Sequence, residues 1–564
     1  MTNQTPRLMV GKNHSQGRRN IMAENSGAQF DFIIAGAGSA GSILAARLSE
    51  DGKTRVLVLE AGPPDSHPLI HIPIGTGKVW NMPSLNWSYM SDPEPHMDGR
   101  RLFHPRGKVV GGSGAINMAA YVRGHAGDYD RWAQMGLGEW SYERVLPYFK
   151  RSENYAGGGD DYHGAGGPIQ TQLNQTTDPL MESWLEAGRS AGYGATDDYN
   201  AASQDGAARM QFNIGGGRRS NSAVAFLRPA LKRSNLTLIT GAQATRIVMD
   251  GKRATGIEYR HGDATRTVTA AEVILAGGAY NSPQLLMLSG IGPAAHLAEL
   301  GIDVVEDVAG VGGNLQDHPA ISLEFQRTQT SEFMRNLRLD KLTINMARAW
   351  LFKSGPASQP VGFSTAFVKS REGLEIPDLQ FFFRPYSRMA RQWLPLVYPH
   401  GQDAVSITAC HLRPDSRGEV RLKSTDPMAP VGFVNNFLST EADREAMRQA
   451  FKISRDLLGQ PALDAVRGAE TTPGAAVQSD ADIDAFIRET AMTVFHPIGT
   501  CRMGTDPASV VDPELRVRGI EGLRVVDASV MPDLVGGNIN ACVMMIAEKA
   551  SDIIRGNAPL PVET

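Results

Sequence analysis

The glycine-rich segment Gly36-Ala37-Gly38-Ser39-Ala40-Gly41 constrains the fold more than any other part of the chain. An apolar, strand-like run over residues 32–35 precedes it, and residues 43–48 follow with the spacing of a helix that has one apolar face. A second apolar run, residues 55–59, ends in Glu60, nineteen residues after the last glycine. This order of strand, glycine turn, helix, strand and acid predicts a dinucleotide-binding unit.

In such a unit the glycines allow a tight turn and a close approach of the backbone, and the helix N-terminus faces the pyrophosphate. Glu60 is placed to accept hydrogen bonds from ribose hydroxyls, and its charge disfavours a 2′-phosphate. The motif therefore predicts FAD or NAD, and it does not choose between them.

The composition is typical of a soluble globular protein with room for two or more domains: 564 residues, 41% hydrophobic and 21% charged, with a net charge of −4. This near-balance of charge gives no reason to expect nucleic-acid binding. No apolar run approaches the eighteen residues of a transmembrane helix. Three cysteines without a C-x-x-C pair favour a reducing compartment, and the histidine spacing predicts no metal site.

Residues 1–29 are polar and basic, with no acid before Glu24 and no apolar stretch of a secretory signal. We expect a disordered tail here, or translation that starts at Met22. An organelle-targeting leader fits the charge bias less well.

Two further segments are rich in glycine. Residues 106–117, Arg-Gly-Lys-Val-Val-Gly-Gly-Ser-Gly-Ala-Ile-Asn, suit backbone N–H contacts to a polar ligand, although a plain turn has the same composition. An incomplete nucleophile elbow around Ser113 does not favour a serine hydrolase, because its fifth position is not glycine. In residues 277–293, we expect a helix with Ser282 as its N-cap and Pro283 as its first residue.

The rest of the chain divides into a strand-rich stretch and a mixed one. Residues 236–276 read as strands, and residues 321–490 mix strands and helices without a nucleotide fingerprint, so we expect the latter to cover the substrate. Near the end, residues 523–526 predict an edge strand that leads into Asp527 beside the cofactor. By themselves, His496 before a proline and the Gly537-Asn538-Ile539-Asn540 loop are typical of structural positions.

Taken together, five segments resemble the glucose–methanol–choline (GMC) oxidoreductases, a family of FAD enzymes. They are residues 36–62, 106–117, 277–293, 311–318 and 496–540, and the resemblance runs in order from about residue 30 to 558. The third segment, Asn-Ser-Pro-Gln-Leu-Leu-Met-Leu-Ser-Gly-Ile-Gly-Pro, is the most specific.

The resemblance implies an α/β fold, α+β overall, and decides the cofactor for FAD. It implies a Rossmann-type FAD-binding domain built from residues 30–155, 205–320 and 495–558. A discontinuous second domain, residues 156–204 and 321–494, is expected to place a sheet flanked by helices over the substrate site.

The resemblance also implies a set of cofactor-binding residues, and it raises two questions about them. In choline oxidases a histidine at the position of His104 is covalently joined to FAD, so His104 either carries a covalent flavin or packs near it. The common Gly-Gly-Ser-Ser pattern is here Gly112-Ser113-Gly114, which widens the space near the flavin. The implied set is Gly36, Gly38, Ser39, Ala40, Gly41, Glu60, Ala61, His104, Arg106, Gly111, Gly112, Ser113, Asn117, Met118, Ala244, Asp527, Ala528 and Asn538.

His496 and Asn540 stand where the family keeps its active-site histidine and a second histidine or asparagine. A neutral imidazole can take the proton of an alcohol as its C–H becomes a hydride donor. An amide can donate a hydrogen bond to the developing alkoxide. The expected reaction is oxidation of a primary alcohol to the aldehyde, with reoxidation by a quinone-like acceptor or O2.

The substrate is less constrained. Choline-oxidising relatives usually carry a glutamate where this chain has Phe363, which disfavours choline. Aromatic residues suggest an apolar pocket, or else ordinary strand core, and Arg384 can meet an anionic or polyether group or pair with a carboxylate. The predicted pocket residues are Phe363, Phe367, Phe383, Arg384 and Phe495.

We expect an aliphatic or glycol-type alcohol, with aryl or furanic alcohols and choline as alternatives. A lyase or a fatty-acid photodecarboxylase on the same scaffold is a further alternative, and a cofactor-free binding role is the least favoured. The expected location is the cytoplasm, either free or associated with the inner face of the membrane.

Overall fold

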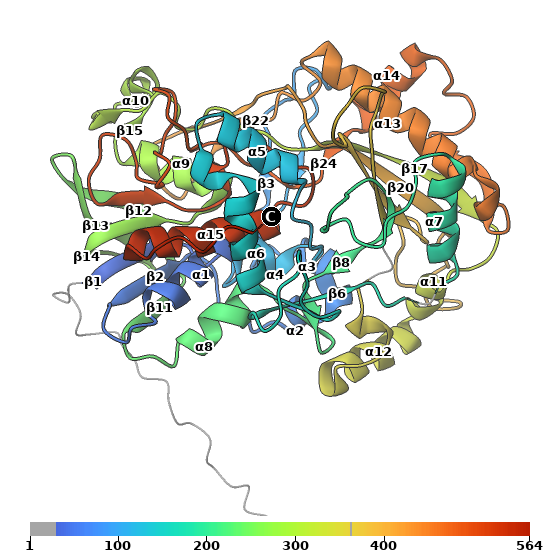
Figure 1. Ribbon diagram of the computed structural model, residues 1–564, viewed down its shortest axis with the longest axis horizontal. Coiled ribbons are helices and arrows are strands. Elements are labelled where there is room, and N and C mark those ends of the chain that lie inside the picture. The colour runs from blue at the N-terminus through green and yellow to red at the C-terminus, as the bar shows by residue number, and fades with distance from the viewer. Residues whose placement is uncertain (1–29, 177, 361–363, 564) are drawn as a thin grey trace, which may run out of the picture.

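The computed structural model describes residues 30–176, 178–360 and 364–563. The predicted tail, residues 1–29, and the predicted pocket residue Phe363 lie outside the described residues. Two seven-stranded sheets organise a mixed α/β structure, as predicted (Figure 1). Among the described helices, none is long and apolar enough to cross a membrane.

The first sheet contains five parallel strands whose order is that of a dinucleotide-binding fold. Because both of its faces are covered, its central strands are continuous apolar runs. The predicted edge strand before Asp527 is confirmed, since it pairs with the end of β14. Two antiparallel strands, β12 and β13, extend the sheet from β14. The parallel order is β11 (Leu236–Thr240), β2 (Val56–Glu60), β1 (Phe30–Ala35), β14 (Ala264–Leu275) and β25 (Leu523–Val525), with β12 at Ala242–Asp250 and β13 at Arg253–His261.

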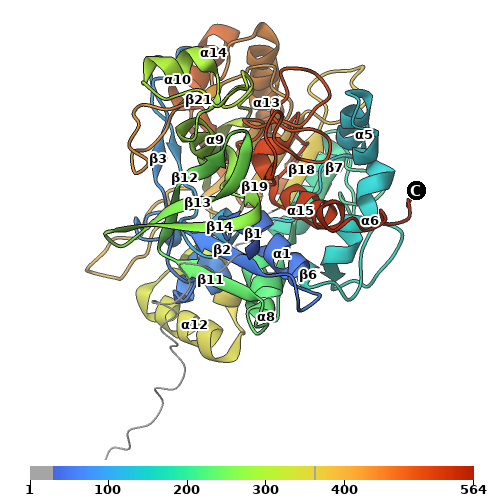
Figure 2. The ribbon, with the colours of Figure 1, turned by 90° about the vertical axis from the view of Figure 1, so that its left-hand side faces the viewer.

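Helices α1 (Ser39–Leu48) and α15 (Asn540–Arg555) pack together against this sheet (Figure 2). A bidentate ion pair from Arg47 to the buried Glu548 joins them. The start of α1 lies so close to the preceding turn that a Cβ on Gly41 would fall 1.9 Å from the carbonyl oxygen of Gly36. The third glycine of the fingerprint is therefore required by backbone packing.

The helix expected to begin at Ser282 begins earlier, since α9 spans Gly278–Leu288 and contains Pro283. A proline inside a helix leaves the carbonyl four residues before it without its N–H partner. Here that carbonyl belongs to Ala279, and it accepts a hydrogen bond from the Thr500 hydroxyl at 2.7 Å. A partner more than two hundred residues away thus makes the longer helix possible.

The second sheet is antiparallel, and α13 (Glu441–Gly459), α7 (Leu180–Ser190) and α14 (Asp480–Thr490) pack on its outer face (Figure 1). Side chains alternate across each strand. On β19, Phe381 and Phe383 enter the core beneath these helices, whereas Phe382 and Arg384 point to the other face. The strands run in the order β23 (Arg467–Thr472), β17 (Pro319–Arg327), β20 (Ala404–His411), β19 (Leu379–Arg384), β18 (Ser364–Val368) and β7 (Gly206–Arg209), with β24 (Met492–Thr493) beside β17.

Shorter elements connect the two sheets and cover their edges. The helices are α2 (Pro68–His71), α3 (Thr76–Val79), α4 (Gly112–Ile116), α5 (Ala126–Gln134), α6 (Tyr142–Ser152), α8 (Arg228–Ala230), α10 (Ala294–Glu299), α11 (Glu332–Asn336) and α12 (Leu339–Phe352). The short strands are β3 (Tyr89–Met90), β4 (Phe103–His104), β5 (Glu153–Tyr155), β6 (Ile169–Leu173), β8 (Gln211–Phe212), β9 (Ile214–Gly215), β10 (Arg218–Arg219), β15 (Ile291–Gly292), β16 (Glu306–Asp307), β21 (Glu419–Arg421) and β22 (Gly432–Val434).

The division into two domains stays a prediction, and several strands cross it, of which β7 is the clearest. Strand β7 falls in residues 205–320, which the sequence assigns to the cofactor domain. It pairs instead with β18 of the second sheet.

The alternation of side chains on β19 predicts that two neighbouring substitutions lower the free energy of unfolding by different amounts. Phe383→Ala removes a fully buried ring that stacks on Trp184 at 4.5 Å between centroids, and we expect a loss of about 3–5 kcal/mol. Phe382→Ala, the matched control, removes a ring that borders a cavity, so it leaves less new void. Thermal melting should show the larger fall in Tm for Phe383→Ala. Equal falls would contradict the assigned faces.

Candidate active site

A cavity of about 770 Å³ is lined by residues of both sheets. The turn after β1, Glu60 at the end of β2, and Asp527 after β25 all reach it. They meet there because the carboxyl ends of parallel strands lie at one edge of the sheet, where nucleotide ligands bind in open α/β folds. The inner face of the second sheet supplies the opposite wall through residues such as Phe382 and Thr408.

The start of α1 fits a pyrophosphate. Within the described structure, the first turn of α1 has no acidic residue, and its N-cap Gly38 provides no capping side chain. The N–H groups of that turn are therefore available to an anion, and the helix dipole favours one. A second glycine segment lies against the first, because a Cβ on Gly112 would approach the Gly38 Cα to 2.8 Å. Side chains here would close the space that an extended dinucleotide needs.

Two buried carboxylates frame this end of the cavity. Glu60 accepts hydrogen bonds from the backbone N–H groups of Ala37 at 2.9 Å and Gly62 at 2.8 Å, so it holds the glycine turn as well as facing the cavity. Burial raises the pKa of Glu60 to about 7. Asp527 accepts from the Gly278 N–H at 2.8 Å and the Ser282 hydroxyl at 2.6 Å, which ties α9 to the strand edge.

Most of the predicted cofactor residues line the cavity, and three of them do not. Gly41 serves helix packing, and Gly111 precedes α4 with a φ of +92°. His104 is fully buried, and its ring nitrogens contact the Tyr280 hydroxyl at 2.8 Å and the Asn435 amide at 3.3 Å. The residues that do line it are Gly36, Gly38, Ser39, Ala40, Glu60, Ala61, Arg106, Gly112, Ser113, Asn117, Met118, Ala244, Asp527, Ala528 and Asn538.

The placement of His104 is that of a packing residue, and a covalent bond to the cofactor stays a prediction. Its ring packs edge-on against Phe433 at 4.9 Å between centroids. Burial, with a contribution from the nearby Arg106, holds the pKa of His104 well below its ordinary value.

His496 lines the cavity, and both nitrogens of its buried ring have partners. Nε2 lies 3.1 Å from the Asn538 amide nitrogen, and in the tautomer that carries its proton on Nδ1 it accepts a hydrogen bond from that amide. Nδ1 lies 3.0 Å from Nδ1 of His318 and is then the donor of that contact. Burial, with His318 and Arg106 adding to it, holds the pKa of His496 well below its usual range.

Two residues that position His496, Asp317 and His318, were not predicted from the sequence, although both lie in the segment 311–318 that carries the resemblance. The Asp317 carboxylate accepts the His496 backbone N–H at 2.8 Å and the Thr493 hydroxyl at 2.5 Å. Burial raises the pKa of Asp317 to about 6, and burial lowers that of His318 to about 3. The pairing of β17 with β24, which sets Pro319 opposite Thr493, and a bridge between Gln316 and Ile498 bring this segment to His496.

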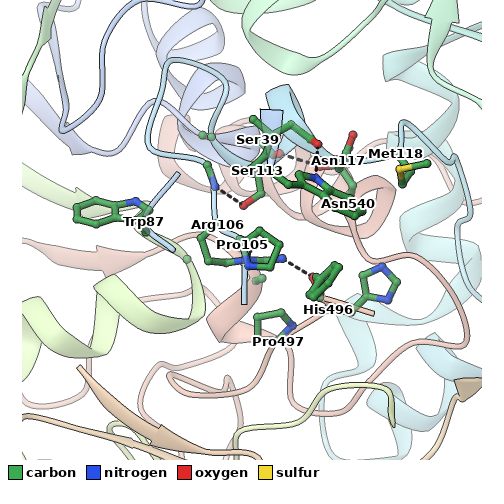
Figure 3. Close-up of a pocket in the computed structure, with 18 of the residues that line it drawn as sticks. Ser39, Trp87, Pro105, Arg106, Ser113, Asn117, Met118, His496, Pro497 and Asn540 are labelled. Carbon is green, nitrogen blue, oxygen red and sulfur yellow. Dashed lines mark hydrogen bonds between the residues drawn. The ribbon is translucent and has the colours of Figure 1, made fainter. Parts of the chain in front are cut away.

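Asn540, the other predicted catalytic residue, also lines the cavity, at the first position of α15. Its Oδ1 accepts a hydrogen bond from the Ser39 hydroxyl at 2.7 Å, which fixes the amide, and its Nδ2 lies 4.0 Å from Met544 Sδ of the same helix. Figure 3 shows Ser39, Asn117 and Asn540 on one side of the cavity, and Arg106, His496 and Pro497 on the other.

At the substrate end, two of the predicted pocket residues line the cavity and two do not. Arg384 and Phe495 line the cavity. Phe383 points to the opposite face of β19, into the core under α13. Phe367 packs against Tyr199 at 5.5 Å between centroids and is fully buried. The apolar wall is built instead from other side chains: Met118, Met210, Phe212, Phe333, Phe382, Tyr386, Met492 and Val494.

Comparisons with known proteins agree with this arrangement. Two family models described as GMC oxidoreductase match residues 30–320 and 414–547. Oxygen-dependent choline dehydrogenases from Brucella ovis and Rhizobium etli are 47% and 44% identical, and each alignment covers 94% of this chain and 96% of the relative.

Solved structures share the fold over the same span. Pyridoxine 4-oxidase from Mesorbium loti has a TM-score of 0.85 at 32% identity, covering 94% of this chain and all of that one. Formate oxidase from Aspergillus oryzae has a TM-score of 0.86 at 28% identity, covering 94% and 98% of the two chains. The chain therefore belongs to the GMC oxidoreductase family and is an FAD-dependent enzyme that acts on CH–OH donors.

Proposed function

We propose that this enzyme oxidises a primary alcohol to the aldehyde and that His496 is the base. The observation that carries the proposal is a buried imidazole at the cavity wall whose Nε2 lies 3.1 Å from the Asn538 amide and, in the tautomer protonated at Nδ1, accepts from it. An alcohol that displaces this amide contact donates its O–H to the same atom. The depressed pKa of His496 keeps the ring neutral, and therefore able to accept that proton, at physiological pH.

The other groups around the cavity stabilise the charge that develops on the alcohol oxygen and orient the alcohol. The Asn540 amide, fixed by Ser39, can donate to the oxygen that gains charge as the proton leaves, without itself carrying charge. The glycine turn after β1, Glu60 and Asp527 would hold FAD, which would supply a hydride acceptor for the carbinol carbon and a route for the two electrons to O2 or a quinone-like acceptor. The wall of aromatic and methionine side chains excludes water from this step.

Choline is the second candidate substrate, because the relatives named above are described as choline dehydrogenases. Against it stands Phe363, where choline-oxidising relatives usually carry a glutamate. Anaerobic mixing of the holoenzyme with alkanols, glycols, benzylic and furanic alcohols and choline tests both candidates. Loss of the oxidised-flavin absorbance with one class supports alcohol oxidation. No loss with any of them points to a lyase or a decarboxylase.

We predict that His496→Ala retains FAD but lowers the rate of flavin reduction by about 10²–10⁴, the usual contribution of a general base. Stopped-flow absorbance under anaerobic conditions measures this rate. His96→Ala, which changes an exposed histidine outside the cavity, is the control and should leave the rate unchanged. An unchanged rate in His496→Ala would remove that residue from the proposed chemistry.

The depressed pKa of His496 also predicts the pH dependence. A histidine whose pKa is lowered stays neutral as the pH falls through about 6.5, the ordinary value, and becomes protonated only further down. The rate of flavin reduction at saturating alcohol should therefore hold its neutral-pH value to below about pH 6. Stopped-flow measurement of the flavin-reduction rate across this pH range tests the prediction, with FAD retention checked at each pH. A half-maximal rate near pH 6.5 would contradict the assignment.

A further inference from the structure

The substrate end of the cavity is cationic. Arg384 from β19 lines it, and so do Arg388 and Arg391 from the segment that follows. Among the described residues that line the cavity, the carboxylates are Glu60 and Asp527, and both lie at the cofactor end. The wall that receives the substrate therefore presents three guanidinium groups and no carboxylate from the described chain.

Hydroxyl groups of the second sheet hold two of these arginines side by side. Arg384 Nη1 donates to Thr408 Oγ1 at 2.6 Å, and Arg388 Nη1 donates to Ser322 Oγ at 2.8 Å. The two hydroxyls are themselves hydrogen-bonded at 2.7 Å, because Ser322 and Thr408 are directly opposite each other on β17 and β20. Two like charges on adjacent hydroxyls repel, and an anion between them relieves that repulsion.

Glu324, the nearest carboxylate, is occupied by other donors. It accepts the Arg388 backbone N–H at 2.7 Å and the Ser387 hydroxyl at 3.0 Å. In the described structure it makes no ion pair with the Arg388 guanidinium, which is exposed to the cavity. Partial loss of hydration inside the cavity and the adjacent Arg384 lower the pKa of Arg388 to about 10, with Glu324 acting in the opposite direction, so Arg388 remains charged at neutral pH.

The cationic wall lies at a distance from His496. Ser322 is four residues along the chain from His318, which is about 13 Å at the rise of a β-strand, and His318 contacts His496. A molecule that meets the guanidinium groups with one end and Nε2 of His496 with the other must therefore be extended.

We propose, on the basis of the alcohol oxidation above, that the substrate is an extended alcohol whose far end carries a carboxylate bound by Arg384 and Arg388. Guanidinium groups bind carboxylates through paired, charge-assisted hydrogen bonds. The same wall repels a quaternary ammonium group, so it selects against choline by charge.

Anaerobic flavin reduction in the holoenzyme tests this with a graded series of ω-hydroxy carboxylates, 1-alkanols of matched length, and choline. In the wild type, we expect a lower KM for the hydroxy carboxylate than for the matched alkanol. Arg388→Gln, which keeps the backbone bond to Glu324, should raise the KM for the hydroxy carboxylate by about 10- to 100-fold and leave that for the alkanol unchanged. Arg388→Lys should restore part of the difference.

Arg335→Gln is the matched control, because it removes the same charge from an exposed arginine on α11 outside the cavity. It should change neither KM. Equal KM values for the hydroxy carboxylate and the alkanol in the wild type, or a preference for choline, would overturn the carboxylate assignment and leave alcohol oxidation standing. Flavin that none of these alcohols reduces would overturn the proposed function instead.

Discussion

The position of His496 at the cavity depends on one buried carboxylate. Asp317 accepts hydrogen bonds from the backbone N–H groups of His318 and His496 and from the Thr493 hydroxyl, so three points of the chain are fixed on one side chain. Phe495 lies between Thr493 and His496 in the chain and has a φ of +71°, a left-handed conformation that is costly for a bulky residue.

Two hydrogen bonds offset this local strain. Arg106 donates to the Phe495 carbonyl at 2.6 Å, and the Thr493 hydroxyl accepts the Phe495 N–H at 2.7 Å. These two hydrogen bonds, together with the bond from the His496 N–H to Asp317, hold the turn in one conformation. In that conformation His496 lines the cavity. The arginine of the second glycine segment thus supports the proposed base, His496, as well as lining the cavity.

The cofactor half was predictable from the sequence because its signals are local. The fingerprint, Glu60 and the strand before Asp527 each carry their own turn or strand chemistry within a few residues, and the structure places them as expected. The start of α9 was not predictable in this way. The hydroxyl that lets Pro283 lie inside the helix comes from Thr500, which no local rule connects to it.

The substrate half was harder to predict for a physical reason. The apolar run over β19 shows that the strand is buried, but a one-residue shift in register exchanges its two faces. The packing of α13 and α7 decides that Phe383 enters the core and Phe382 the cavity. His318 reaches the cavity through the pairing of β17 with β24, and its only sequence signal was the family resemblance of the 311–318 segment. Arg388 lies in the connection that follows β19, and no sequence pattern pointed to it.

The contact between Ser39 and Asn540 joins residues 501 positions apart. During synthesis on the ribosome, the first glycine segment emerges long before the helix that completes its surroundings. A nascent chain therefore holds half of a nucleotide site with no partner, and apolar surface on α1 stays exposed until α15 arrives. Capture of the flavin is then coupled to completion of the chain, and a truncation within the last helix would leave a polypeptide that neither closes the site nor retains its cofactor.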